Sequence, residues 1–225
     1  MELSIAKRFL LLAQHPEKGR MLISEIHLKF GLAGALLLQM SLDDQLSIKD
    51  EVLYIKKGSQ YADPKIREIA AMIQQARRPR KIKYWIHRIG QKASKWRLYY
   101  YDQMAQERLI KVEMKKFLGI IPYLKTYLVN RQLRNKMIQE LKNEFFQKRD
   151  IAPTHMVVLG LVEACRMHKV LTKEKSQYKV LRRDLKQLVK ESPVSSNVDK
   201  TISQVQAAIV SSIVVTTIAS NVGTS

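Results

Sequence analysis

The stretch that decides the fold is Gly31-Leu-Ala-Gly-Ala-Leu-Leu-Leu-Gln-Met-Ser-Leu42. Its only polar side chains are Gln39 and Ser41, so an α-helix formed here is apolar on nearly every side. A helix of this kind is stable only when other elements cover it all round. We therefore predict a buried helix over Leu32–Leu42.

Long helices are expected on both sides of this stretch, because only eight Gly and six Pro interrupt the chain. Gly31 and Gly34 mark places where the backbone turns or packs closely, so Met21–Phe30 is predicted as a separate helix before Leu32–Leu42. The other predicted helices share apolar residues at helical spacing and cover Ser4–Ala13, a helix from Pro64 with Asp63 as its N-cap, a helix from Pro79, Trp96–Arg108, Arg131–Phe146, Pro153–His168 and Lys173–Lys190.

Two β-hairpins are predicted where the spacing of apolar residues changes from the helical pattern to alternation with polar residues. Gln45–Lys49 and Glu51–Lys56 alternate apolar and polar residues around a turn at Lys49-Asp50. A second hairpin is predicted over Leu109–Val129, with Gly119-Ile-Ile-Pro122 near its turn. The expected fold class is mainly α: a single helical domain over residues 1–225, with a small N-terminal hairpin and a protruding β-hairpin.

Both termini and the cysteine content bear on localisation. The N-terminus lacks the layout of a signal peptide. The longest apolar stretch, Val205–Ala219, contains five polar residues and falls short of the roughly 20 apolar residues of a spanning helix. It is predicted to be a core helix, with a tail anchor as the alternative. Cys165 is the only cysteine and reads as a small core residue in a reducing compartment, which indicates a cytoplasmic protein.

Positive charge dominates the composition, with 40 Lys and Arg against 20 Asp and Glu and a formal net charge of +20. The charge is concentrated between Ile69 and Tyr101, where no Asp or Glu occurs and aromatic residues are interleaved. An uncompensated run of this kind repels itself and attracts polyanions such as nucleic acid, acidic lipid or an acidic protein. Its cations are Arg77, Arg78, Arg80, Lys81, Lys83, Arg88, Lys92, Lys95 and Arg97.

The second hairpin carries an apolar tip. Ile120, Ile121, Pro122 and Tyr123 come together at its turn. Exposed apolar side chains are costly in water but favourable in a membrane interface, so this segment is a candidate membrane-inserting wedge. The alternative is that it packs on another subunit, which would make it an oligomerisation contact, or on its own domain.

Catalytic and cofactor motifs are missing from the sequence. The five histidines are not at metal-ligand spacing on one helical face, and there is no Cys-x-x-Cys pair. Glycine-rich phosphate loops and nucleophile elbows are also missing. Asp43-Asp44 is interpreted as a turn. We therefore expect no enzyme activity, no cofactor and no metal.

Nucleic-acid binding is the alternative function. Three helices followed by a hairpin over Ser4–Lys57 would match the order of a winged helix. A recognition helix reads bases with exposed polar side chains, whereas the third helix here, Leu32–Leu42, is nearly all apolar. The basic residues also lie elsewhere, beyond residue 77. Nucleic acid is thus the less favoured partner.

Several motifs, in order, resemble the Golgi phosphoprotein 3 family, including its bacterial relatives. The similarity extends over most of residues 9–220 and rests on the order of the motifs. They are Leu10–Ala13 with Glu17–Arg20, Gly31–Leu38, Gln45–Ile48, Asp63–Ala70, Trp85-Ile86, and Leu118–Pro122 with Lys125–Tyr127.

The resemblance implies a mostly helical, non-enzymatic peripheral membrane protein with a protruding hairpin. Eukaryotic members bind phosphatidylinositol 4-phosphate and connect glycosyltransferases to vesicle coats. Their lipid pocket uses a Trp and an Arg at positions where this chain has Ser24 and Ala33. It also uses two basic residues, of which Arg97 is matched here and Lys95 fits if the register shifts by one.

The sequence as a whole predicts a cytoplasmic, peripheral membrane protein. Acidic lipid headgroups are expected at Arg88, Lys92, Lys95 and Arg97, and the hairpin tip is expected to insert. Further expected partners are a protein cargo or coat component, or the acidic tail of another protein.

Overall fold

A computed structural model describes residues 3–118, 120–147, 151–191 and 198–209. The elements in chain order are α1 (Ile5–Ala13), α2 (Glu25–Leu42), β1 (Leu46–Lys49), β2 (Val52–Ile55), α3 (Pro64–Gln74), β3 (Arg80–Lys81), α4 (Ile82–Gln106), β4 (Ile110–Phe117), β5 (Ile121–Leu128), α5 (Arg131–Gln147), α6 (Pro153–Ala164), the 3-10 turns η1 (His168–Val170) and η2 (Lys175–Gln177), α7 (Tyr178–Glu191), and a helix over 198–209. The fold is mainly α with small antiparallel hairpins, as predicted.

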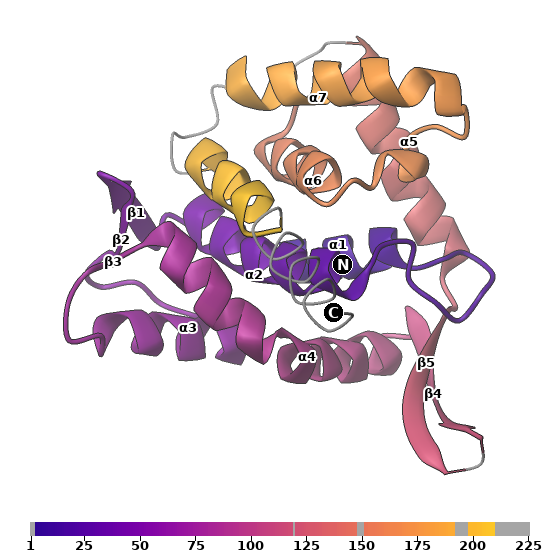
Figure 1. Ribbon diagram of the computed structural model, residues 1–225, viewed down its shortest axis with the longest axis horizontal. Coiled ribbons are helices and arrows are strands. Elements are labelled where there is room, and N and C mark those ends of the chain that lie inside the picture. The colour runs from indigo at the N-terminus through magenta and orange to yellow at the C-terminus, as the bar shows by residue number, and fades with distance from the viewer. Residues whose placement is uncertain (1–2, 119, 148–150, 192–197, 210–225) are drawn as a thin grey trace, which may run out of the picture.

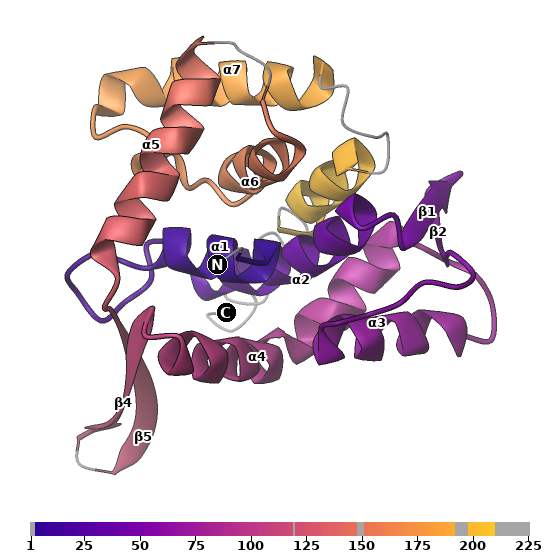
Figure 2. The ribbon, with the colours of Figure 1, turned by 180° about the vertical axis from the view of Figure 1, so that it is seen from behind.

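Helix α2 lies at the centre of the molecule, as its sequence requires. Every residue from Phe30 to Leu38 is buried. Helix α2 packs against α1, α4 and α6, and all of them contribute to one hydrophobic core. Figure 1 shows α1 and α2 in the middle, with α5, α6 and α7 on one side and α3 and α4 on the other. The view from behind in Figure 2 shows the same three layers.

Several local signals were read correctly. Ser4 caps α1 by accepting a hydrogen bond from the Lys7 amide at 3.4 Å, and Asp63 caps α3 through the Lys65 amide at 2.7 Å. Both hairpins pair antiparallel as predicted, but Lys49 lies opposite Val52, so the first turn is Asp50-Glu51 and lies one residue later than the predicted Lys49-Asp50. Their turns follow from local turn residues and alternating apolar residues, which depend on nearby sequence alone.

The division into two helices before Leu42 was wrong. Helix α2 runs unbroken from Glu25 to Leu42, with both glycines inside it. At Gly31 an added Cβ would lie 2.3 Å from Cζ of Phe9 and 2.6 Å from Sγ of Cys165, so glycine lets α1 and the buried cysteine approach the helix. Close packing, not a turn, explains this glycine. With two helices before the first hairpin, the winged-helix order is absent.

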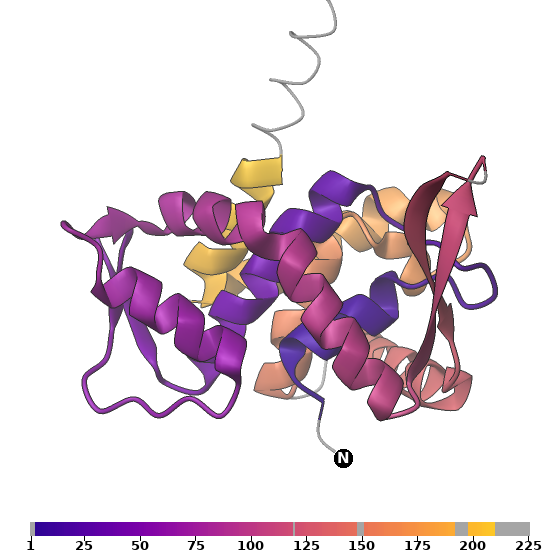
Figure 3. The same ribbon diagram turned by 90° about the horizontal axis from the view of Figure 1, so that it is seen from below.

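The helices predicted from Pro79 and over Trp96–Arg108 are one helix, α4, which bends in its middle (Figures 1 and 3). Arg80 and Lys81 form β3 instead of a first helical turn and pair with β2, making a three-stranded sheet. A long-range strand pairing therefore overrides the local helix signal at Pro79. Two later helix boundaries differ from the prediction. Helix α6 ends at Ala164 and not at His168, and α7 begins at Tyr178 and not at Lys173.

The apolar C-terminal segment is buried where the structure describes it. In the helix over 198–209, Val205, Ala208 and Ile209 are buried in the core. The remainder of the predicted helix, 210–219, lies outside the described residues. Within the described ranges, no helix is both long enough and apolar enough to cross a membrane.

We predict that Gly34→Val weakens the contact between α2 and this last helix. A Cβ at Gly34 would lie 2.4 Å from Cγ2 of the buried Val205. Overpacking of this kind costs about 1–3 kcal/mol, so the urea denaturation midpoint should fall.

The exposed position Ser94 on α4 supplies the control. Ser94→Val should change the free energy of unfolding by about 0.5 kcal/mol or less. Equal losses for both variants would contradict the packing of α2 against the helix over 198–209.

Candidate membrane-docking surface

The four cations predicted as a lipid site do not come together. On a helix with 3.6 residues per turn, Arg88, Lys92 and Lys95 share one face of α4, while Arg97 lies about 180° away. Lys92 borders α3 and pairs with Glu68 at 3.1 Å, whereas Arg97 borders α2. The structure therefore separates Arg97 from the other three residues.

Arg88 and Lys95 lie on the exposed side of α4. Neither has an ion pair with any residue that the structure describes. Figure 3 shows α4 at the front when the molecule is seen from below. We call Arg88, Lys92 and Lys95 the α4 basic row.

We call the cations between Ile69 and Tyr101 the basic window, and acidic residues from other elements neutralise part of it. Lys81 pairs with Glu51 at 2.7 Å, Lys92 with Glu68, and Arg97 with Glu25. The other six cations of the window have no ion pair with a described residue: Arg77, Arg78, Arg80, Lys83, Arg88 and Lys95. Arg80 instead stacks its guanidinium over the ring of Tyr84, 4.9 Å from the centroid.

A cleft of about 450 Å³ lies between Arg97 and one face of the second hairpin, where Pro122 and Tyr123 of the predicted wedge line it. Arg97 donates from Nη1 to both carboxylate oxygens of Glu25, at 2.8 and 2.9 Å, and its guanidinium lies 5.9 Å from the ring centroid of Tyr101. Burial raises the pKa of Tyr101 to about 12, although Arg97 acts in the opposite direction. Two cations line this cleft, Arg97 and Arg20. Glu25 neutralises Arg97, whereas Arg20 has no ion pair with a described residue.

The hairpin is anchored at its base by a buried side-chain pair. Gln14 donates from Nε2 to the backbone oxygen of Thr126 at 2.5 Å, and Thr126 Oγ1 donates to Gln14 Oε1 at 2.7 Å. Both side chains are buried. These bonds hold the half of the hairpin nearest the helices against the end of α1. The outer half, from Ile121 to Leu124 on β5, is exposed.

The outer half of the hairpin is exposed, and its turn carries apolar side chains beside Lys115 and Lys116. Ile120 is 81% exposed, Ile121 59% and Tyr123 40%, as the predicted wedge requires. Sequence reasoning missed Leu118, which is 79% exposed, and Met114, at 66%. Both could have been found by extending the apolar tip across the turn to its strand partners, since Met114 faces Leu124 in the register.

Ser24 and Ala33 do not line the cleft beside Arg97. Ser24 is the exposed N-cap of α2, and its hydroxyl lies 2.8 Å from Nδ1 of His27. Ala33 is fully buried in the core. The cleft therefore receives neither an aromatic platform nor a second arginine from these positions.

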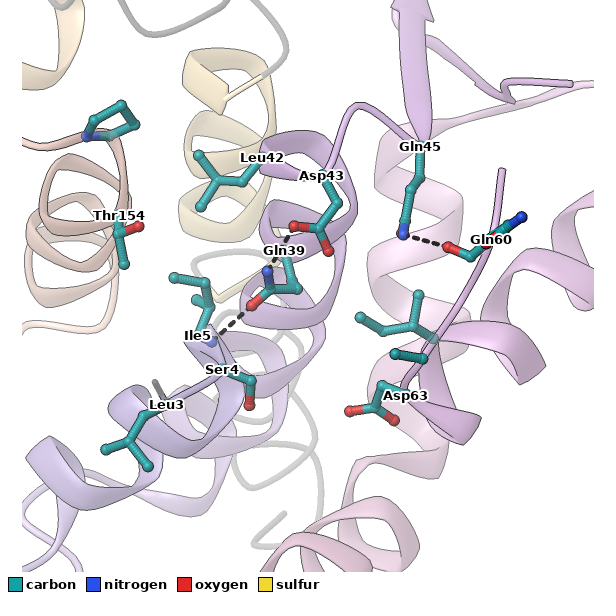
Figure 4. A pocket seen from close by; sticks show the side chains of 13 residues that line it. Leu3, Ser4, Ile5, Gln39, Leu42, Asp43, Gln45, Gln60, Asp63 and Thr154 are labelled. Atoms are coloured by element: carbon teal, nitrogen blue, oxygen red, sulfur yellow. Dashed lines mark hydrogen bonds between the residues drawn. The ribbon is translucent and has the colours of Figure 1, made fainter. Parts of the chain in front are cut away.

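A second cleft, of about 570 Å³, lies between the N-terminal ends of α1 and α3 and the C-terminal end of α2 (Figure 4). Its polar groups bond mainly to each other: Gln39 Oε1 accepts from the Ile5 amide at 2.9 Å, and Gln45 Nε2 donates to the Gln60 oxygen at 2.8 Å. Asp43 and Asp63 also line it and would repel an anionic headgroup. Among the residues described, no three His, Cys, Asp or Glu side chains are grouped to hold a metal ion.

Comparison with known proteins identifies the family. The sequence model of the Golgi phosphoprotein 3 (GPP34) family matches residues 5–205, a range that includes α2, α4, both hairpins and the cleft beside Arg97. No curated protein matches the chain. Because the match covers most of the 225 residues, the chain belongs to the Golgi phosphoprotein 3 family.

Proposed function

We propose that this protein is a peripheral membrane-binding adaptor that docks on anionic lipid surfaces through the α4 basic row and the tip of the second hairpin. One observation carries the proposal: the second hairpin ends in exposed apolar side chains, and helix α4, which packs against β4, carries exposed cations that have no ion pair with a described residue. Figure 1 shows the β4–β5 hairpin extending past α4, and Figure 3 shows both elements on the lower face.

The two features would act on different parts of a lipid bilayer. Each Lys or Arg near an anionic surface contributes about 1 kcal/mol of attraction. The side chains of Leu118, Ile120 and Ile121, which are exposed to water in the free protein, would gain free energy by entering the interface. Combining the two gives reversible docking that depends on both lipid charge and salt concentration.

Attraction to acidic lipid in general fits the structure better than a dedicated phosphoinositide pocket. Arg97 already has a carboxylate partner, so a phosphate group would have to compete with Glu25. The positions at which the family resemblance implies further pocket residues hold Ser24 and Ala33, and neither lines the cleft. We therefore propose that the wild-type protein discriminates only weakly among anionic lipid headgroups.

Protein partners complete the proposed adaptor role. Membership in this family supports a role that joins a membrane to other proteins. Oligomerisation through the hairpin stays a prediction that competes with membrane insertion, because the same apolar tip would serve both. A tip buried between two copies would be withheld from lipid, so the two uses can be distinguished by experiment.

The first test removes charge from the α4 basic row. Arg88→Gln combined with Lys95→Gln should lower partitioning onto phosphatidylglycerol-containing vesicles roughly ten- to thirty-fold at low salt, since two contributions of about 1 kcal/mol are lost. Co-sedimentation measures the effect. Ile120→Ser with Ile121→Ser should also weaken binding and leave its salt dependence unchanged.

The matched control carries the same change in charge on the other side of α2. Lys179→Gln with Lys186→Gln alters two exposed lysines of α7, which lies across α2 from α4 (Figure 1). This pair should bind nearly as well as the original protein. Equal binding to neutral and anionic vesicles, or equal losses in both charge pairs, would refute the docking surface.

The second test concerns Glu25. Glu25→Gln removes the carboxylate that neutralises Arg97, and a released guanidinium can form a charge-assisted bond to phosphate. We expect vesicles containing phosphatidylinositol 4-phosphate to bind several-fold more tightly, a gain of about 1 kcal/mol. The exposed Glu17→Gln gives the same change in net charge without touching Arg97. If both variants bind equally well, the ion pair does not control the cleft.

A further inference from the structure

We propose that a groove between α5 and the segment 169–174 binds an acidic peptide segment of a partner protein. The groove encloses about 760 Å³ and lies apart from the α4 basic row and the hairpin tip. Residues of three parts of the chain line it: the loop after α1, one face of α5 and the segment around η1. This inference uses none of the residues on which the proposed membrane docking rests.

Charge at the groove is strongly one-sided. Lys142, Lys169 and Lys173 line it, and none of them has an ion pair with any described residue. The single carboxylate among its lining residues belongs to Glu174, which accepts a hydrogen bond from Gln177 at 2.5 Å. Three unpaired lysines facing one carboxylate favour an anionic occupant.

Arg134 adds a buried cation to the same groove. It is 5% exposed and donates from Nε to the Leu11 oxygen at 3.0 Å and from Nη2 to the Leu12 oxygen at 3.1 Å. These carbonyls belong to the last turn of α1, where the helix dipole is negative. A carbonyl carries only a partial charge, and no described carboxylate pairs with this guanidinium. A carboxylate in the groove would therefore supply a full counter-charge that the fold lacks.

The shape of the groove favours an extended peptide over a small anion. The α5 residues that line it run from Arg134 to Lys142, which corresponds to about 12 Å at 1.5 Å per residue. An extended peptide covers that length with about four residues. Apolar side chains, among them Ile138 and Leu171, lie between the charged ones, so alternating apolar and acidic residues would match the lining.

We assign the occupant to a partner protein. Outside the described ranges this sequence contains two carboxylates, Glu2 and Asp150, and they lie far apart along the chain. Neither stretch supplies an acidic run. The groove and the α4 basic row lie in different layers of the fold, with α5 on one side of α2 and α4 on the other (Figures 1 and 2). A membrane and a peptide could therefore be bound at the same time.

Fluorescence anisotropy with the full chain and a fluorescein-labelled peptide of alternating Glu and Leu tests the inference. The triple variant Lys142→Gln, Lys169→Gln, Lys173→Gln should weaken binding by about ten-fold or more, since three ion pairs of up to about 1 kcal/mol each are lost. The control triple variant Lys49→Gln, Lys57→Gln, Arg77→Gln makes the same change in charge at exposed sites elsewhere and should weaken binding by less than about three-fold.

Three results would overturn the proposal. Equal losses in the two triple variants would show that net charge alone attracts the peptide. Equal binding of a peptide alternating Glu and Gly would remove the role of the apolar lining. Full displacement by millimolar inorganic phosphate, or by anionic vesicles, would assign the groove to a small anion or to lipid. The first two results do not bear on vesicle binding through α4, so the two proposals can fail separately.

Discussion

The rest of the structure depends on the burial of α2. From Phe30 to Leu38 this helix has no side that water can face, so other helices have to enclose it. Helix α4 is one of the helices that pack on α2, so one of its faces is buried and the opposite face is exposed. Its inner surface carries Trp96 and Tyr100, which are fully buried. Its outer surface is left with the cations, and in this way the requirement to bury α2 places a basic row on the outside of the molecule.

The same arrangement decides which cations remain available. Side chains at the two borders of the buried face of α4 meet neighbouring helices, where Lys92 finds Glu68 and Arg97 finds Glu25. Residues farther out, such as Arg88 and Lys95, meet no acidic partner among the described residues. Position on the helix therefore distinguishes cations that hold the fold together from cations that can attract a partner.

Local signals in the sequence predicted the caps, the hairpins and most helices, because each depends on residues only a few positions apart. The unbroken α2 could not be predicted in this way, since Gly31 reads as a break until Phe9 and Cys165 are seen packed against it. The pairing of Arg97 with Glu25 joins residues 72 positions apart. The exposed hairpin tip was predicted because its apolar residues are adjacent in the chain, whereas the basic groove beside α5 combines three distant segments.

The central claim is that the hairpin tip enters an anionic membrane, and depth-sensitive fluorescence tests it most directly. Burial raises the pKa of the Cys165 thiol, so a cysteine introduced by Ile120→Cys should be labelled selectively with an environment-sensitive dye. Addition of phosphatidylglycerol-containing vesicles should shift its emission to the blue, while a label at Lys57→Cys should stay unchanged. An unshifted tip label on protein that co-sediments with the same vesicles would contradict the account.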